Sequence, residues 1–259
     1  MSGHLRSTSL PSRPHSSVIK VEEELYSLKT CLCRQPATIV TLCDGLRKLA
    51  YVYNCVEDIV RLPRNQDGVC SPQQKKIVEK ELELSLVLLD ICNAMQENFA
   101  ELKMSIQELQ LVRKRGDHAT VNLKIESFFR SAKNMRKHFK KYNSKATSEG
   151  HSLVRLLAEA RVIAISLFES ASYLLPKQIT TSNSSKWCIL SRRFQKRKVV
   201  HEEDKLQALE CGIGDLESGA GFLFRGMIQT RVSLLNILSS SGCLAALAPC
   251  GRPHVHTLI

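Results

Sequence analysis

Apolar residues recur along this chain at alternating steps of three and four, the spacing of one face of an α-helix. After a polar first stretch, this pattern returns in six segments separated by short polar or proline-containing breaks. The six apolar rows span residues 18–32, 39–60, 88–109, 121–142, 153–174 and 206–237. No stretch of comparable length alternates between apolar and polar residues, so we expect helices and no strands.

Prolines and polar clusters set the expected helix ends. Pro63 is expected to end the second segment and to be followed by a loop of Arg, Asn, Asp and Gly. Ser71 and Pro72 have the residue types of an N-cap and a first helical position, so a long third helix is expected from there. Pro176 is expected to end the fifth helix before a polar loop at about 177–186.

Short breaks favour antiparallel neighbours, and the spacing of three and four favours knobs-into-holes packing. The sequence therefore predicts an all-α fold, an elongated antiparallel helical bundle of about six amphipathic helices with coiled-coil-like packing. We expect a disordered basic N-terminal arm at 1–15, the bundle domain at 16–239 and an atypical tail at 240–259. An open rod that pairs with another chain fits the same periodicity, so the sequence leaves the oligomeric state open.

Glycines interrupt the last segment at Gly212, Gly214, Gly219 and Gly221. Each costs roughly 1 kcal/mol relative to alanine inside a helix. These glycines lie off the apolar row, so we expect the helix to persist but to be weak or bent there.

Several sequence blocks together resemble a large plant family of unknown molecular function that is related to the BYPASS proteins. The blocks are residues 6–15, 53–63, 84–92, 166–170, 215–219 and 230–238, and the resemblance covers about residues 4–239. It implies a plant origin, a helical fold, a link to root and shoot development, and no established catalytic residues. The glycines of the last helix and the tail at 240–259 depart from the family's usual pattern.

Motifs of catalysis and cofactor binding are missing from the sequence. There is neither a P-loop nor a G-x-S-x-G nucleophile motif, so we expect a non-enzymatic protein without a cofactor. The ten cysteines include no C-x-x-C pair, and no secretory signal precedes them, so we expect reduced and mostly buried thiols. Four tail residues have no common zinc spacing, so no metal site is expected: Cys243, Cys250, His254 and His256.

Positive charge is concentrated in two stretches of a chain whose net charge is +12. Residues 113–145 hold eleven Lys or Arg and two acids, and four of the basic residues form a stripe at helical spacing: Arg130, Lys133, Lys137 and Lys140. An acidic protein, an anionic membrane or nucleic-acid phosphate fits such a stripe, and so does plain solvation. The sequence argues against nucleic acid, because Phe128 and Phe139 lie on the apolar row and not on a stacking surface.

The second basic stretch, 186–198, combines aromatic and basic side chains. Its candidate residues are Trp187, Arg192, Arg193, Lys196, Arg197 and Lys198. The segment suits a membrane interface, a partner groove, a nuclear-import cluster or a charged linker, and the sequence leaves these open.

The N-terminal arm carries one short regulatory motif. Arg6, Ser9 and Pro11 have the form R-S-x-S-x-P, which phosphorylation of Ser9 would make a ligand for a 14-3-3-type phospho-reader. A transit peptide is an alternative for this serine-rich arm, although Pro11 and Pro14 break any amphipathic helix in it.

Together these features predict a non-enzymatic adaptor protein with a role in root and shoot development. The alternative is a peripheral membrane protein that binds anionic lipid through its basic segments. No apolar run is long enough to span a bilayer, and we expect an intracellular protein of the cytoplasm or nucleus that is not secreted.

Overall fold

The computed structural model describes residues 16–34, 36–139, 152–183 and 195–246. Within these ranges it holds seven α-helices, one short 3₁₀ helix and no strand. The helices are α1 (Ser16–Arg34), α2 (Ile39–Val60), α3 (Pro63–Cys70), α4 (Pro72–Arg115), α5 (His118–Met135), the 3₁₀ helix η1 (Arg136–His138), α6 (Ser152–Asn183) and α7 (Gln195–Ala246). The predicted all-α bundle is confirmed.

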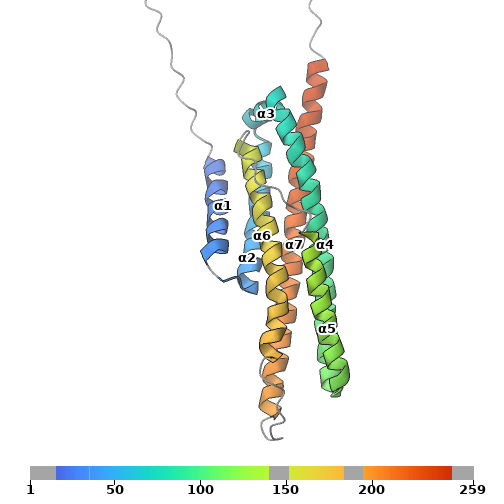
Figure 1. Cartoon of the computed structure of the whole chain (residues 1–259). Coiled ribbons are helices and arrows are strands. Elements are labelled where there is room, and N and C mark those ends of the chain that lie inside the picture. The colour runs from blue at the N-terminus through green and yellow to red at the C-terminus, as the bar shows by residue number, and fades with distance from the viewer. Residues whose placement is uncertain (1–15, 35, 140–151, 184–194, 247–259) are drawn as a thin grey trace, which may run out of the picture.

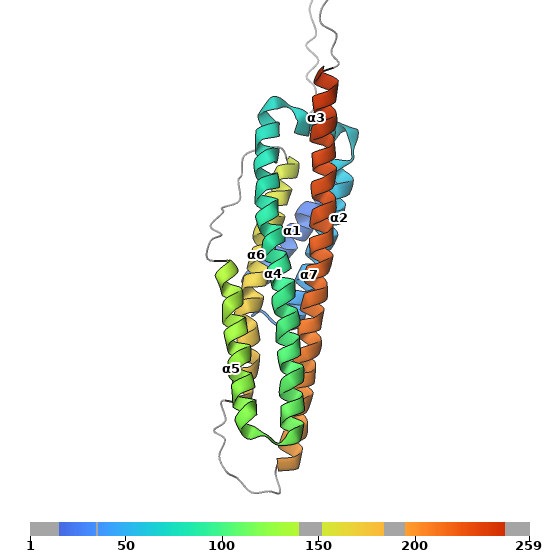
Figure 2. The same ribbon diagram turned by 90° about the vertical axis from the view of Figure 1, so that its right-hand side faces the viewer.

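Four long helices, α2, α4, α6 and α7, form the centre of an elongated bundle (Figures 1 and 2). Helix α1 packs on the outside against α2 and α6, and α5 packs on the outside against α4 and α6. The apolar rows of the helices face inward, and their side chains form one continuous core. Helix α5 lies beside only the lower part of the longer α4 (Figure 2).

Helices α2 and α7 run parallel and pack through glycines that repeat every seven residues. A Cβ added at Gly212 would lie 2.7 Å from Ile39 Cγ2, and one added at Gly219 would lie 3.1 Å from Leu46 Cβ. At Gly226 the corresponding neighbour is Tyr53 Cβ at 3.1 Å. The glycines therefore let the two helix backbones approach closely. Contrary to the expectation that the glycines lie off the packing surface, Gly212 and Gly219 form part of it. The helix is continuous through all four of the glycines that were expected to weaken it.

Two expected breaks are helical in the structure. Residues 63–70, expected as a loop, form α3, because a proline that ends one helix also has the backbone φ of a first helical residue and occupies that position here. Pro176, expected to end the fifth helix, lies inside α6, which continues to Asn183. The chain compensates for this proline with a contact from η1, described below. Helix α7 also continues to Ala246, past the expected boundary at residue 239.

The described cysteines are free thiols, as expected. Contrary to expectation, most of them are not buried. Cys43 and Cys92 are buried in the core, whereas Cys31, Cys33 and Cys211 are exposed. Cys31 and Cys33 lie on α1, and Cys211 lies on α7, where its Sγ accepts a hydrogen bond from Gln207 Nε2 at 3.7 Å.

Candidate functional site

The predicted basic stripe lies on the outer face of α5 and of η1, which follows it directly. Arg130, Lys133 and Lys137 are exposed, and none of them forms an ion pair with any residue of the described ranges. Lys140, the fourth predicted member, lies outside the described residues. The structure thus brings three of the four predicted side chains to one solvated helix face.

The inner face of α5 packs against α4 and α6. Phe128, Met135 and Phe139 are buried, which confirms that these residues belong to the core. At the edge of the contact, Lys124 Nζ pairs with Glu108 Oε2 of α4 at 2.6 Å, and Ser131 Oγ donates to Glu101 Oε1 at 2.6 Å. The apolar side of α5 is therefore buried in the core of the bundle. Its polar side is exposed and can contact another molecule.

A line of acidic side chains runs along α4, and the sequence did not lead us to expect it. This line continues the two carboxylates of α4 that contact α5, Glu101 and Glu108. Glu83, Asp90 and Glu97 repeat every seven residues and are all exposed. Residues seven apart lie almost directly above one another on a helix, and Glu101 and Glu108 extend the same line downward. Of the three upper acids, Glu97 accepts a hydrogen bond from Asn93, and none forms an ion pair with a described residue. The seven-residue spacing of these acids is visible in the sequence and could have identified the line.

Arg136 compensates for the proline inside α6. In a regular helix the N–H of residue 176 would donate to the carbonyl of Ser172, but proline has no N–H. Arg136 Nε and Nη2 lie 3.4 Å and 3.3 Å from this carbonyl oxygen, and the guanidinium stacks 4.2 Å from the centre of the Tyr173 ring. The sequence reading did not single out Arg136, because its role depends on a neighbour about 40 residues away.

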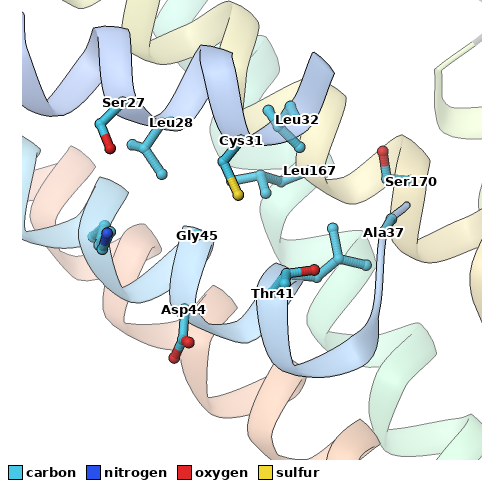
Figure 3. Close-up of a pocket in the computed structure, with 12 residues that line it drawn as sticks. Ser27, Leu28, Cys31, Leu32, Ala37, Thr41, Asp44, Gly45, Leu167 and Ser170 are labelled. Atoms are coloured by element: carbon cyan, nitrogen blue, oxygen red, sulfur yellow. The ribbon is translucent and has the colours of Figure 1, made fainter. Parts of the chain in front are cut away.

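A shallow cavity of about 200 Å³ opens between α1, α2 and α6 (Figure 3). Its lining is partly apolar, and six side chains contribute polar groups: Ser27, Cys31, Thr41, Asp44, Lys48 and Ser170. The Thr41 hydroxyl already belongs to the capping box that starts α2 with Thr38. Pockets for small molecules usually start at about 300 Å³, so this geometry alone assigns no ligand.

The core holds one buried ion pair and two buried thiols. Arg161 Nε donates to Glu81 Oε1 at 2.9 Å and Nη2 donates to Oε2 at 3.1 Å, which joins α6 to α4 through a bidentate contact. Burial raises the pKa of the Glu81 carboxyl, while the hydrogen bonds and charge of Arg161 oppose this shift. Burial also raises the pKa of Cys43 to about 11 and that of Cys92 to about 12. These groups are inaccessible and serve the packing of the helices.

The sequence model of one protein family, described as Protein BPS1, matches residues 45–206 and 193–237 of the chain. The matched segments include all of α4, α5 and α6 and most of α2 and α7. The chain belongs to the BPS1 family. The resemblance expected from the sequence is thereby confirmed, and BPS1 membership links the chain to plant development. Neither a curated protein nor a solved structure matches the chain significantly.

The remaining predicted site residues of this BPS1-family chain are not brought together by the described structure. Arg6, Ser9 and Pro11 lie outside the described residues, as do Trp187, Arg192 and Arg193. Lys196, Arg197 and Lys198 are in the first turns of α7, but their side chains are not described. Among the side chains that are described, no three His, Cys, Asp or Glu residues are grouped as metal ligands.

In the described part of this BPS1-family chain, no helix has a sufficiently long and apolar stretch to cross a bilayer.

Proposed function

We propose that this BPS1-family protein is a non-enzymatic adaptor in root and shoot development that binds a protein partner with an acidic surface. The observation that supports the proposal is the outer face of α5 and η1, where Arg130, Lys133 and Lys137 are exposed without ion pairs to described residues. Rigid helices hold these cations at steps of three and four, which matches carboxylates on a facing helix.

The composition of this face favours a protein over a lipid surface. Membrane-binding helices insert apolar side chains, but the apolar side of α5 is buried against α4 and α6. Leu123, 61% exposed, is the large apolar residue on the outer face of α5. Attraction to a bilayer would then depend on charge almost alone.

A charge-reversal experiment tests the adaptor proposal. Lys133→Glu with Lys137→Glu reverses the stripe, and Lys20→Glu with Lys48→Glu makes the same change of net charge on exposed positions of α1 and α2. Both variants and the wild type are used to purify partners from plant tissue. We expect proteins to be lost with the α5 variant and retained with the control. Identical partner sets from all three proteins would contradict the proposal.

The alternative function is peripheral attachment to anionic membranes, with Leu123 as the observation in its favour. Flotation with vesicles of phosphatidylcholine, with and without phosphatidylserine, distinguishes it. Binding only to the anionic vesicles, reduced by Lys133→Glu with Lys137→Glu and by high salt, would favour the membrane protein.

We further propose that phosphorylated Ser9 recruits a 14-3-3-type phospho-reader. This proposal is supported by the motif of Arg6, Ser9 and Pro11 alone. We expect the Ser9→Ala protein to lose such readers from its partner set while keeping the partners of the α5 face. A Ser9→Ala protein that retains them would end this proposal.

A further inference from the structure

The upper part of α4, beyond the end of α5, continues an interface that already exists within the chain. In the lower half of α4, the carboxylates of Glu101 and Glu108 flank the surface on which α5 lies. In the upper half, Glu83 and Asp90 continue the same line and are exposed, and α5 does not extend to this part of α4 (Figure 2). Val87, between them in sequence, is 43% exposed. This surface therefore suits a second helix with basic residues.

The chain itself offers a helix face of that description. The outer face of α5 and η1 carries three exposed cations, Arg130, Lys133 and Lys137, whose charge is opposite to that of the upper acidic line. A chain cannot place its own α5 on both halves of α4, because the inner face of α5 is buried against the lower half. A second copy of the chain has no such restriction.

The geometry points to a two-fold symmetric dimer in which the outer face of each α5 binds the upper acidic line on α4 of the other copy. The symmetry axis runs perpendicular to the bundle, near the end of α5, so that one copy is inverted relative to the other. The upper part of α4 in one copy, which its own α5 does not reach, then lies against α5 of the other copy. Each α5 lies between two α4 helices, and both contacts are the same by symmetry.

The size of the contact sets its expected strength. Helix α5 has 18 residues and is therefore about 27 Å long, and a helix face is about 10 Å wide. Two such contacts bury roughly 1,000 Å² in total, near the lower limit for specific interfaces. Exposed ion pairs add little each and are screened by salt. We therefore expect a weak dimer, with a dissociation constant of the order of micromolar, that dissociates at high salt.

The inference rests on the same α5 face as the proposed function and names its partner as a second copy. The test measures molar mass by light scattering and sedimentation over a range of protein concentrations. One variant carries Lys133→Glu with Lys137→Glu, and the other carries Glu83→Lys with Asp90→Lys. Each reversal makes the two surfaces alike in charge, so each variant alone is expected to be monomeric. Circular dichroism verifies that both remain helical.

Mixing the two variants gives the decisive result. In the mixture, the acidic α5 of one variant meets the basic α4 of the other, and the unaltered surfaces also match. We expect a heterodimer that binds at least tenfold more tightly than either variant binds itself, while the control Lys20→Glu with Lys48→Glu dimerises like the wild type. A wild type that stays monomeric at about 0.05 M salt would overturn the inference, and so would a mixture that fails to associate.

The outcomes separate the dimer from the adaptor. A monomeric wild type whose partners in plant tissue are lost with Lys133→Glu and Lys137→Glu would leave the adaptor proposal in place and remove the dimer. A dimer with the expected charge dependence, together with an unchanged set of other partners, would establish the dimer and remove the adaptor role of this face.

Discussion

At the scale of single residues, the buried pair of Arg161 and Glu81 is the contact most sensitive to substitution. Both side chains are buried and joined by two hydrogen bonds. The sequence shows an arginine within an apolar row, but it does not show that a carboxylate 80 residues earlier meets it, because that depends on how α4 and α6 align.

Removing the carboxylate should destabilise the fold strongly. Glu81→Leu leaves the Arg161 guanidinium buried without its carboxylate, which typically costs about 3 kcal/mol or more. We expect the double change Glu81→Leu with Arg161→Leu to recover a large part of this loss, because no buried charge remains. Urea unfolding followed by circular dichroism measures both. A double variant less stable than the single one would show that Arg161 has a larger role than its contact with Glu81.

The thiols should differ in reactivity according to their burial. The pKa of Cys43 is about 11, so at pH 8 only about one thiol in a thousand is ionised, and the side chain is also inaccessible. We expect iodoacetamide to label Cys31, Cys33 and Cys211 in the native protein and to label Cys43 and Cys92 only in urea. Mass spectrometry of the peptides identifies the labelled sites. Fast native labelling at Cys92 would contradict its placement in the core.

The same raised pKa values determine a direction of pH dependence. The folded state keeps both thiols protonated above the ordinary value of 9.0, whereas the unfolded chain ionises there. The unfolded state therefore releases more protons at high pH, and these two groups lower the stability as the pH rises above about 9. Replacing both cysteines with alanine should reduce this loss, which urea unfolding at several pH values would measure.

At the scale of helices, the glycines of α7 have two different roles. Gly219 faces Leu46 Cβ at 3.1 Å, whereas the nearest atom to a Cβ at Gly214 is Lys103 Cδ at 3.8 Å. We expect Gly214→Ala to stabilise the protein by up to about 1 kcal/mol through its helix propensity. Gly219→Ala should instead destabilise it, because a Cβ so close to α2 forces the helices apart. Equal effects of the two substitutions in urea unfolding would contradict the close packing of α2 and α7.

The proline in α6 makes a second prediction at this scale. Arg136→Leu removes the donors to the Ser172 carbonyl and the stacking on Tyr173, so we expect a loss of about 1–2 kcal/mol. In a Pro176→Ala background the alanine N–H can donate to this carbonyl, and the loss should be smaller. A double-mutant cycle measures the coupling, and additive effects would separate Arg136 from the proline.

These helix-level features mark the limit of what the sequence predicts. The periodicity of three and four correctly predicts the long helices and nearly all of their inward residues, because both depend on local spacing. The helical run through Pro176 and the role of Gly219 depend on contacts with other helices, which local spacing does not contain. For the candidate site, the sequence identifies the cations of α5 but not the facing acids of α4, because it does not show which helices are neighbours.

At the scale of the whole molecule, four helices are central and two are peripheral. Helix α7 contacts α2 and α4 over much of its length, whereas α1 rests on α2 and α6, and α5 rests on α4 and α6. Elements with fewer buried contacts open at lower free-energy cost. We expect amide hydrogen exchange to be fastest in α1 and α5 and slowest in the centres of α2, α4 and α7. Equal protection of α5 and α7 would contradict this division.

The parallel packing of α2 and α7 also has a consequence for synthesis of the protein. Gly212 and Ile39 touch, but 173 residues separate them in the chain. While the ribosome is still making α6, the inner faces of α2 and α4 lack the helix that covers them. The central core thus closes only after α7 has been translated, and the nascent chain exposes its apolar rows until then. Chaperones that bind nascent chains therefore have a long interval in which to engage this one.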